Sequence, residues 1–190
     1  MGRLGDFEAM QMKLRTRPHS IYMKWLSGPN KGQEVIYVEG KYGGKLLVHR
    51  DGLLGLLSPS LKLDPYGPLA STVSPEPITN AGMGKTLERT LVHTLEGREP
   101  ISLTMDETKD ERSGKTFYLL RKERLAKDKA FKSYKTIILY IDKELLLPLR
   151  ILTYNWADGL LGEYIYNNVK INVGLSDQDF DPKNKAYNFP

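Results

Sequence analysis

The sequence contains no cysteine and has three histidines, His19, His49 and His93, among its 190 residues. The lack of cysteine excludes a disulfide framework, a thiolate nucleophile and a cysteine-ligated zinc or iron–sulfur site. The three histidines share no spacing that would bring two of them to one metal ion from a single helix or strand. A serine motif of the G-x-S-x-G type is also missing. We therefore predict a protein without metal, cofactor or catalytic residues, and not an enzyme.

Long apolar runs are missing as well. No stretch of about 18 apolar residues occurs, so the sequence predicts no membrane-spanning helix. The first six residues lack the apolar core of a signal peptide, so an exported form would carry a leader in addition to this sequence. Basic residues exceed acidic ones to give a net charge of +5, which favours association with anionic surfaces without identifying one.

Two series of β segments flank a less regular middle of the chain. Apolar and polar residues alternate within the segments, as Met10, Met12 and Leu14 show in the first, and this period of two is typical of a half-buried strand. The turns between segments are too short for a crossover helix, so consecutive strands must pair antiparallel. The predicted strands are residues 7–15, 21–25, 33–39 and 45–50, followed by 101–108, 115–124, 135–141, 145–154 and 160–166.

The middle of the chain combines a proline-rich connection with one helix. Four leucines between Leu53 and Leu57 precede a run of prolines, which predicts a long irregular loop that covers apolar surface. Asn80 can cap the helix and Gly97 can end it. Between them an apolar stripe recurs at every fourth position, at Met83, Leu87, Leu91 and Leu95. The tail from Val169 onward is too rich in turn residues for a strand.

These elements predict one domain that spans residues 1–190. Neighbouring strands in a sheet are rotated by about 20–25°, so an antiparallel sheet of nine strands must curl. A helix and an apolar loop are available to cover its concave face. We therefore predict the α+β class, mostly β, with a strongly curved antiparallel sheet, or unclosed barrel, and a helical lid.

Three polar motifs favour structural explanations over functional ones. Residues 79–86 are similar to a phosphate-binding loop, but they lack its first glycine and the preceding segment is proline-rich where a buried strand is required. Asp177, Asp179 and Asp181 match the first three ligands of a calcium loop, but the glycine that such a loop needs is missing, which favours a solvated turn. The basic run 121–135 favours a solvated hairpin loop over a nucleic-acid surface.

Large apolar residues give the stronger functional signal. Methionine side chains are flexible and polarisable, and they adapt to irregular apolar ligands. A bent sheet under one helix can be hollow or filled, and an ordinary core explains these residues equally well. For the hollow alternative, we expect the cavity and its lid to be lined by Met10, Met12, Met23, Trp25, Leu54, Leu57, Met83, Leu87, Leu91, Leu95 and Leu139.

Several local motifs add a family resemblance. Leu147-Pro148-Leu149-Arg150, the hairpin at Asn155 to Gly159, the run from Tyr166 to Leu175 and the late Phe180 resemble the C-terminal half of the LolA/LolB-like lipoprotein-carrier superfamily. The run from Gly32 to Gly40 resembles an uncharacterised exported bacterial family of the same general shape. This resemblance implies an unclosed antiparallel barrel with helices at its mouth, an apolar cavity for acyl chains, and work in the periplasm or at the cell surface.

Together these features predict a non-enzymatic binder or carrier of lipid or lipidated protein, located in the periplasm or exported to the cell envelope. The expected partners are lipid or an acylated protein, and the basic charge would also suit an anionic membrane surface. We expect no nucleic-acid partner and a monomer. Two alternatives stay open: an envelope structural or interaction module with a solid core, and an enzyme whose carboxylates come together only in the fold.

Overall fold

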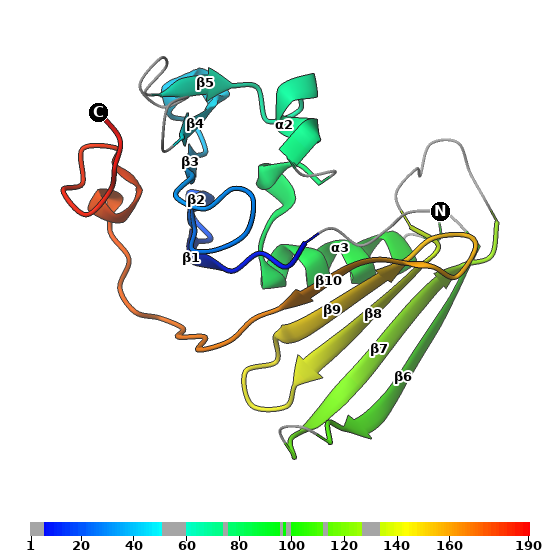
Figure 1. Ribbon diagram of the computed structural model, residues 1–190. Coiled ribbons are helices and arrows are strands. Elements are labelled where there is room, and N and C mark those ends of the chain that lie inside the picture. The colour runs from blue at the N-terminus through cyan, green and yellow to red at the C-terminus, as the bar shows by residue number, and fades with distance from the viewer. Residues whose placement is uncertain are drawn as a thin grey trace. The chain divides into compact units, whose positions relative to one another are not determined.

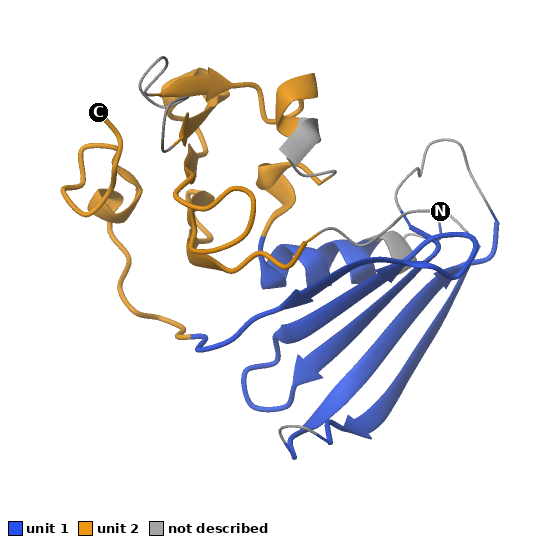
Figure 2. Cartoon of the chain, viewed as in Figure 1, with its two compact units in different colours: residues 1–4, 82–169 blue, residues 5–81, 170–190 orange. Residues whose placement is uncertain are grey.

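The computed structural model describes residues 6–50, 60–73, 76–95, 97, 100–111, 114–126 and 134–190 (Figure 1). The chain divides into two compact units (Figure 2). Unit 1 comprises residues 82–169 together with 1–4, and unit 2 comprises residues 5–81 together with 170–190. None of the described helices has the length and apolar content that crossing a membrane requires.

Unit 2 is built on a five-stranded antiparallel sheet in which each strand pairs with its neighbours in the sequence. Its order is β1 to β5, that is β1 (Met10–Arg15), β2 (Ser20–Trp25), β3 (Glu34–Val38), β4 (Leu46–His49) and β5 (Leu61–Leu63). In the part of unit 2 that the structure describes, four short helical segments accompany the sheet, namely η1 (Tyr42–Gly44), α2 (Pro68–Val73), η2 (Ile78–Asn80) and η3 (Asp177–Phe180).

One face of the unit 2 sheet packs under the segment that contains α2 and η2. The residues that alternate onto this face form a buried cluster, with Ala70 of α2 and Ile78 of η2 packed against it. Burial of these side chains removes apolar surface from water, which is the main stabilising contribution. The cluster comprises Ile21, Met23, Trp25, Val35, Leu46 and Val48.

The C-terminal segment covers the opposite face of the same sheet. Phe180 and Tyr187 are buried there, and the Tyr187 ring stacks on Tyr22 with a centroid separation of 3.9 Å. Ion pairs fix the segment at its edge, since Lys13 Nζ lies 2.8 Å from an Asp179 carboxylate oxygen and Arg15 Nη1 lies 2.7 Å from one of Asp177. Both faces of this sheet are therefore covered by the chain itself.

Unit 1 contains a second five-stranded antiparallel sheet and one longer helix. The helix is α3 (Met83–Leu95), and the sheet order is β10–β9–β8–β7–β6. Tight turns connect β8 to β9 and β9 to β10, where the side-chain oxygens of Asp142 and Asn155 accept backbone N–H groups two to four residues ahead. The strands are β6 (Ile101–Lys109), β7 (Thr116–Arg124), β8 (Thr136–Asp142), β9 (Pro148–Tyr154) and β10 (Leu160–Ile165).

The predicted class is confirmed: the protein is mostly β, its strands pair antiparallel, and it has a small helical part. The strands form two hydrogen-bonded sheets of five, so the described residues hold ten strands where the sequence predicts nine. That the chain is a single domain over residues 1–190 stays a prediction.

The differences from the sequence prediction lie in the connecting segment. The expected irregular loop contains β5 and α2, and the three-residue β5 is too short to show a period of two although Leu61 and Leu63 pair with Val48 and Leu46. The helix begins at Met83 rather than directly after Asn80, because Asn80 lies in η2 and its side-chain amide bonds Glu76.

Candidate functional site

An apolar row of side chains crosses all five strands of the unit 1 sheet. Cross-strand pairing places Met105 of β6 opposite Leu120 of β7, Leu120 opposite Leu139 of β8, Leu139 opposite Ile151 of β9, and Ile151 opposite Tyr164 of β10. Residues paired in this way project from the same face of a sheet. The three central side chains are buried, whereas Met105 is 66% exposed and Tyr164 is 48% exposed. We call this set the apolar row.

Helix α3 covers the centre of the apolar row. Leu87 and Leu91, one turn apart on the helix, pack against the cluster that contains the three central residues. Four strand spacings of about 4.8 Å make the row about 19 Å long. Its two end residues, Met105 and Tyr164, stay exposed.

The next row along the same face extends the exposed apolar surface on the β6 side. Leu103 of β6 pairs with Lys122 of β7, and Lys122 pairs with Ile137 of β8. Leu103 is 39% exposed, whereas Lys122 and Ile137 are buried. Leu103 and Met105 lie two residues apart on β6, so they project from one face and form a continuous exposed patch. A buried cation therefore lies beside this patch.

Charged side chains lie at the end of this face where the turn from β8 to β9 is found. Lys143, in the turn after β8, lies with its ammonium 2.7 Å from a carboxylate oxygen of Glu107 on β6. The same ammonium lies 4.8 Å from the centre of the Tyr118 ring, within the range of a cation–π contact. These contacts place polar groups at one end of the apolar surface, as expected where it meets water.

The opposite face of the unit 1 sheet combines charged pairs with apolar side chains, such as Ile138 and buried Leu152. Arg150 pairs with Glu163 across β9 and β10 at 2.7 Å, and its guanidinium lies 5.1 Å from the centre of the Tyr140 ring. Glu123 accepts ion pairs from Arg121 at 3.0 Å and Lys135 at 3.1 Å, which lower the pKa of its carboxyl group. Ion pairs of this kind are typical of a solvated surface.

The sequence of α3 gives it modest intrinsic helix stability. Gly84 lies in its first turn, and glycine costs about 1 kcal/mol relative to alanine within a helix. Thr86 and Thr90 turn their hydroxyl groups back onto carbonyl oxygens of the preceding turn, at 3.1 and 2.7 Å, a contact that slightly weakens helices. The packing of Leu87 and Leu91 on the sheet therefore contributes most of what holds α3 in place.

A partly buried tyrosine lies at the margin of this face. Tyr166 follows β10 and packs partly buried against the cluster under α3. Burial raises the pKa of Tyr166, with a smaller contribution from neighbouring Tyr164. Its hydroxyl group therefore stays protonated at neutral pH, and the margin of the face carries no negative charge from tyrosine.

Three of the residues predicted to line a cavity meet in unit 1. Leu87, Leu91 and Leu139 belong to one apolar cluster. Met83 begins α3 and is half-buried, and Leu95 ends it, where the structure describes the backbone only. Helix α3 and strand β8 thus bring together three of the residues predicted to form the cavity and its lid.

The other predicted lining residues belong to unit 2. Met23 and Trp25 are buried members of a packed cluster, Met12 packs against it, and Met10 is exposed on β1. Leu54 and Leu57 lie outside the described residues. The predicted set therefore comes from two different clusters, and its role in binding stays a prediction.

Sequence reasoning missed the exposed ends of the apolar row. Leu103 and Met105 alternate with polar residues in β6, which predicts a strand face but gives no sign that this face lacks a cover. Tyr164 became part of the row only through its pairing with Ile151. Cross-strand register, which a single sequence does not contain, was needed to find the site.

The aspartates that match part of a calcium loop bind the chain's own cations instead. Asp177 pairs with Arg15 and Lys41, and Asp179 with Lys13. Among the described residues, no three histidine or carboxylate side chains gather closely enough to hold a metal ion.

Comparison with known proteins places the chain in a family. Residues 1–189 match the model of a family described as protein of unknown function DUF1571. No match to a curated protein was found. Among solved structures, a DUF1329 family protein from Desulfovibrio piger is similar over 90% of this chain and 80% of that chain, with 13% identity and a TM-score of 0.44.

Two further similar structures come from proteins of the kind that the sequence resembles. A putative outer membrane lipoprotein-sorting protein domain from Vibrio parahaemolyticus is 14% identical, with a TM-score of 0.41 over 87% of this chain. This chain spans 64% of it, less than two thirds. A LolA superfamily protein from Nitrosomonas europaea is 12% identical, with a TM-score of 0.35 over 88% of this chain and 70% of that chain. The resemblance to this superfamily is confirmed as a likeness.

Proposed function

The chain belongs to the DUF1571 family, and we propose that it is a non-enzymatic binder or carrier of lipid or lipidated protein in the periplasm or at the cell surface. In this proposal an acyl chain lies on the β6 end of the apolar row, beside α3. The observation that carries the proposal is the row itself, which is continuous across five strands, buried at its centre and exposed at both ends.

The energetics of acyl burial support this use of the surface. Each methylene that leaves water contributes about 0.8 kcal/mol, so an acyl chain gains affinity from contact area without directed polar groups. Leu103 and Met105 offer adjacent exposed contact area next to buried Leu120. Methionine adapts its shape to a flexible ligand, which suits chains of different length.

Helix α3 has the properties that a lid over this surface requires. It is held mainly by two leucines and carries Gly84, Thr86 and Thr90, which weaken it as an isolated helix. A small displacement of such a helix costs less than the unfolding of a strand. A ligand chain can therefore replace part of the contact between α3 and the sheet.

The experiment that tests the proposal is displacement of a fluorescent fatty acid from the purified protein, after extraction and mass spectrometry of any lipid that it carries. Replacing exposed Met105 by glutamine should weaken probe binding about five- to tenfold, because a polar amide replaces an apolar contact. Met105→Leu should keep the probe affinity close to that of the parent, because leucine keeps the apolar contact. The matched control is Leu69→Gln, because Leu69 of unit 2 is similarly exposed, at 63%, and should leave binding unchanged.

An interaction module with a solid core is the competing function, and one observation favours it. In unit 2 the predicted lining residues Met23 and Trp25 are packed into a core rather than facing a cavity. If the protein carries no lipid and binds no fluorescent fatty acid, and if Met105→Gln changes nothing in this assay, it is such a module.

A further inference from the structure

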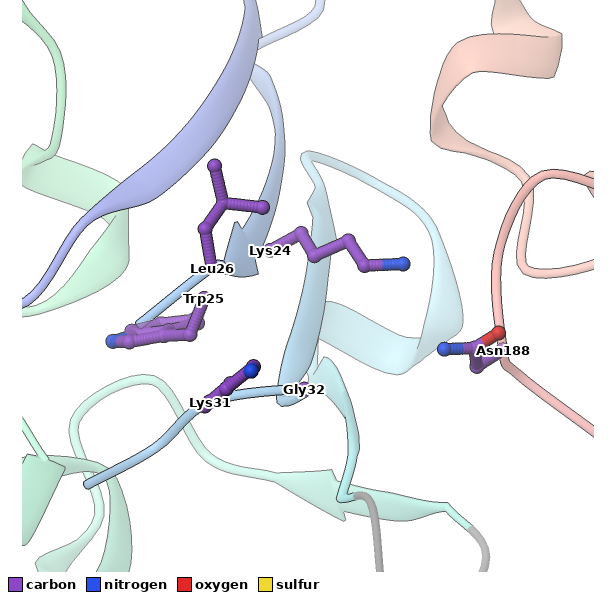
Figure 3. Close-up of a pocket in the computed structure, with 6 residues that line it drawn as sticks. All are labelled: Lys24, Trp25, Leu26, Lys31, Gly32 and Asn188. Carbon is purple, nitrogen blue, oxygen red and sulfur yellow. The ribbon is translucent and has the colours of Figure 1, made fainter. Parts of the chain in front are cut away.

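A pocket in unit 2 lies where the β2–β3 hairpin meets the C-terminal segment (Figure 3). Its volume is about 400 Å³, which is within the range of small-molecule sites of roughly 300–1,000 Å³. The lining residues come from the end of β2, from the hairpin loop and from the tail: Lys24, Trp25, Leu26, Lys31, Gly32 and Asn188. We call it the hairpin pocket.

A single buried carboxylate positions two sides of the hairpin pocket. Glu34 of β3 has no exposed surface, and its Oε1 lies 2.9 Å from Lys24 Nζ. Its Oε2 accepts the backbone N–H of Asn188 at 3.1 Å. Figure 3 shows the Lys24 side chain extending toward Asn188. The ammonium group and the tail are therefore held in place before any ligand arrives.

Backbone hydrogen bonds fix the remaining wall. The N–H of Trp25 bonds Gln33 at 2.9 Å, and the N–H of Gly32 bonds Trp25 at 3.0 Å. The Trp25 indole N–H donates to Glu8 at 3.1 Å, so the ring has a set orientation and Glu8 is itself engaged. The hairpin pocket therefore has two walls that the chain defines independently of a ligand.

The charges of the hairpin pocket favour a ligand with one negative charge. Lys24 and Lys31 line it, and none of the described residues that line it has a carboxylate. Glu34 neutralises Lys24, which leaves one net positive charge. An ammonium group has three N–H donors, so Lys24 can bond Glu34 and still donate to a ligand oxygen. A singly charged oxyanion therefore matches both the charge and the donors.

The apolar wall indicates that the ligand is an amphiphile. Leu26 is 51% exposed and lines the hairpin pocket together with the two lysines, whereas Trp25 is 7% exposed and its ring packs into the cluster on the other face of β2. A small inorganic ion would leave this apolar surface in contact with water. A ligand that joins a charged oxygen group to an apolar portion would cover it.

We propose that the hairpin pocket binds the singly charged oxyanion of an amphiphile, with its oxygens between Lys24 and Lys31 and its apolar portion on Leu26. A fatty-acid carboxylate and the phosphodiester of an anionic phospholipid both have this chemistry. The site belongs to unit 2, and it does not depend on acyl binding at the apolar row of unit 1.

The test uses Trp25 as its own reporter. Trp156 is the second tryptophan of the chain, so Trp156→Phe leaves Trp25 as the single emitter. In this background Trp25 fluorescence is titrated with decanoate, with phosphatidylglycerol vesicles and with phosphatidylcholine vesicles, each at low salt. A saturable change with decanoate identifies a carboxylate, and a change with phosphatidylglycerol but not phosphatidylcholine identifies a phosphodiester.

Variants decide whether the response arises in the hairpin pocket. Lys31→Gln should weaken the binding about three- to fivefold, as expected for one partly exposed charge contact. Leu26→Gln should weaken it similarly, whereas the control Lys170→Gln, at an exposed position of the tail segment, should leave it unchanged. Far-UV circular dichroism confirms that each variant is folded.

Three results would overturn the proposal. The first is no saturable response to decanoate or to phosphatidylglycerol. The second is binding that Lys31→Gln leaves unchanged. The third is inorganic phosphate binding as tightly as the amphiphiles, with no effect of Leu26→Gln. Loss of probe binding in Met105→Gln with an unchanged Trp25 response would separate this site from the apolar row.

Discussion

The two sheets of this protein have the same strand count and the same simple neighbour order, but they differ in how the chain covers them. In unit 2 the α2–η2 segment packs on one face and the C-terminal segment packs on the other. In unit 1 a single helix covers the centre of one face, and Met105 and Tyr164 stay exposed at the ends of the same apolar row. A large contiguous apolar patch left exposed on a folded chain is a sign of a binding site.

Under the proposed function, this difference gives the two units different roles. A sheet covered on both faces gains stability from burial, and its tail acts as a structural element. In the proposal, the exposed ends of the apolar row give up part of that stability and keep surface for a ligand. The charges agree with this division, because the aspartates of the tail bind cations of β1 in unit 2.

The largest expected effect on the free energy of unfolding tests the structural role of the tail. Phe180 is buried on the second face of the unit 2 sheet. Phe180→Ala should lower the free energy of unfolding by about 3–5 kcal/mol, because it removes a buried aromatic side chain and leaves a cavity. Urea unfolding measures this. The control Ile171→Ala, at an exposed position before η3, should change it by less than about 0.5 kcal/mol. A similar small loss for both variants would show that the tail is not part of the core.

A smaller effect concerns two glycines, one in each unit. A Cβ at Gly84 of α3 would meet no atom, so Gly84→Ala should stabilise the helix by about 0.5–1 kcal/mol. A Cβ at Gly28 would lie 2.7 Å from a Glu8 side-chain carbon, and its φ of +89° is strained for alanine, so Gly28→Ala should destabilise. Thermal unfolding of both variants gives the signs. The account of α3 as a weak lid fails if Gly84→Ala has no effect or a destabilising one.

A pH titration tests the ionic part of the tail contact. Hydrogen bonds from Arg15 and Lys41 lower the pKa of Asp177, and those from Lys13 and Ser176 lower that of Asp179. A carboxyl group whose pKa is lower in the folded state stabilises the fold above its unfolded value of about 3.9. That stability is lost as the pH falls through the lower folded value. Asp179→Asn should therefore be less stable than the parent at pH 7, and its free energy of unfolding should change less between about pH 5 and 2. If the free energies of unfolding of the variant and the parent depended on pH in the same way, the ionic role would be contradicted.

The smallest effect on the free energy of unfolding is expected at the exposed end of the apolar row. Met105 is mostly exposed, so Met105→Ala should change the free energy of unfolding by less than about 0.5 kcal/mol. Buried Leu139, two strands away in the same row, should cost about 2–5 kcal/mol when replaced by alanine. If Met105→Ala destabilised as much as Leu139→Ala, the end of the row would be covered and unavailable to a ligand.

The sequence predicts the strands well, because alternation and turn residues are local signals. The β8–β9–β10 meander follows from apolar runs separated by turns at Asp142 and Asn155. The lid contacts of Leu87 and Leu91 follow from helical spacing. The division into two sheets, the docking of the tail and the exposure of Met105 depend on contacts between residues far apart in sequence, for which alternation gives no partner.

Photoaffinity labelling identifies the segment of the chain on which a bound acyl chain lies. The protein is loaded with a fatty acid that carries a diazirine in its chain, irradiated and digested with trypsin, and the labelled peptide is identified by mass spectrometry. Cleavage after Arg98 and Lys109 yields residues 99–109, a peptide that contains all of β6. The account predicts that this peptide carries most of the label and loses it in Met105→Gln. Label confined to peptides of unit 2, or unchanged by Met105→Gln, would contradict it.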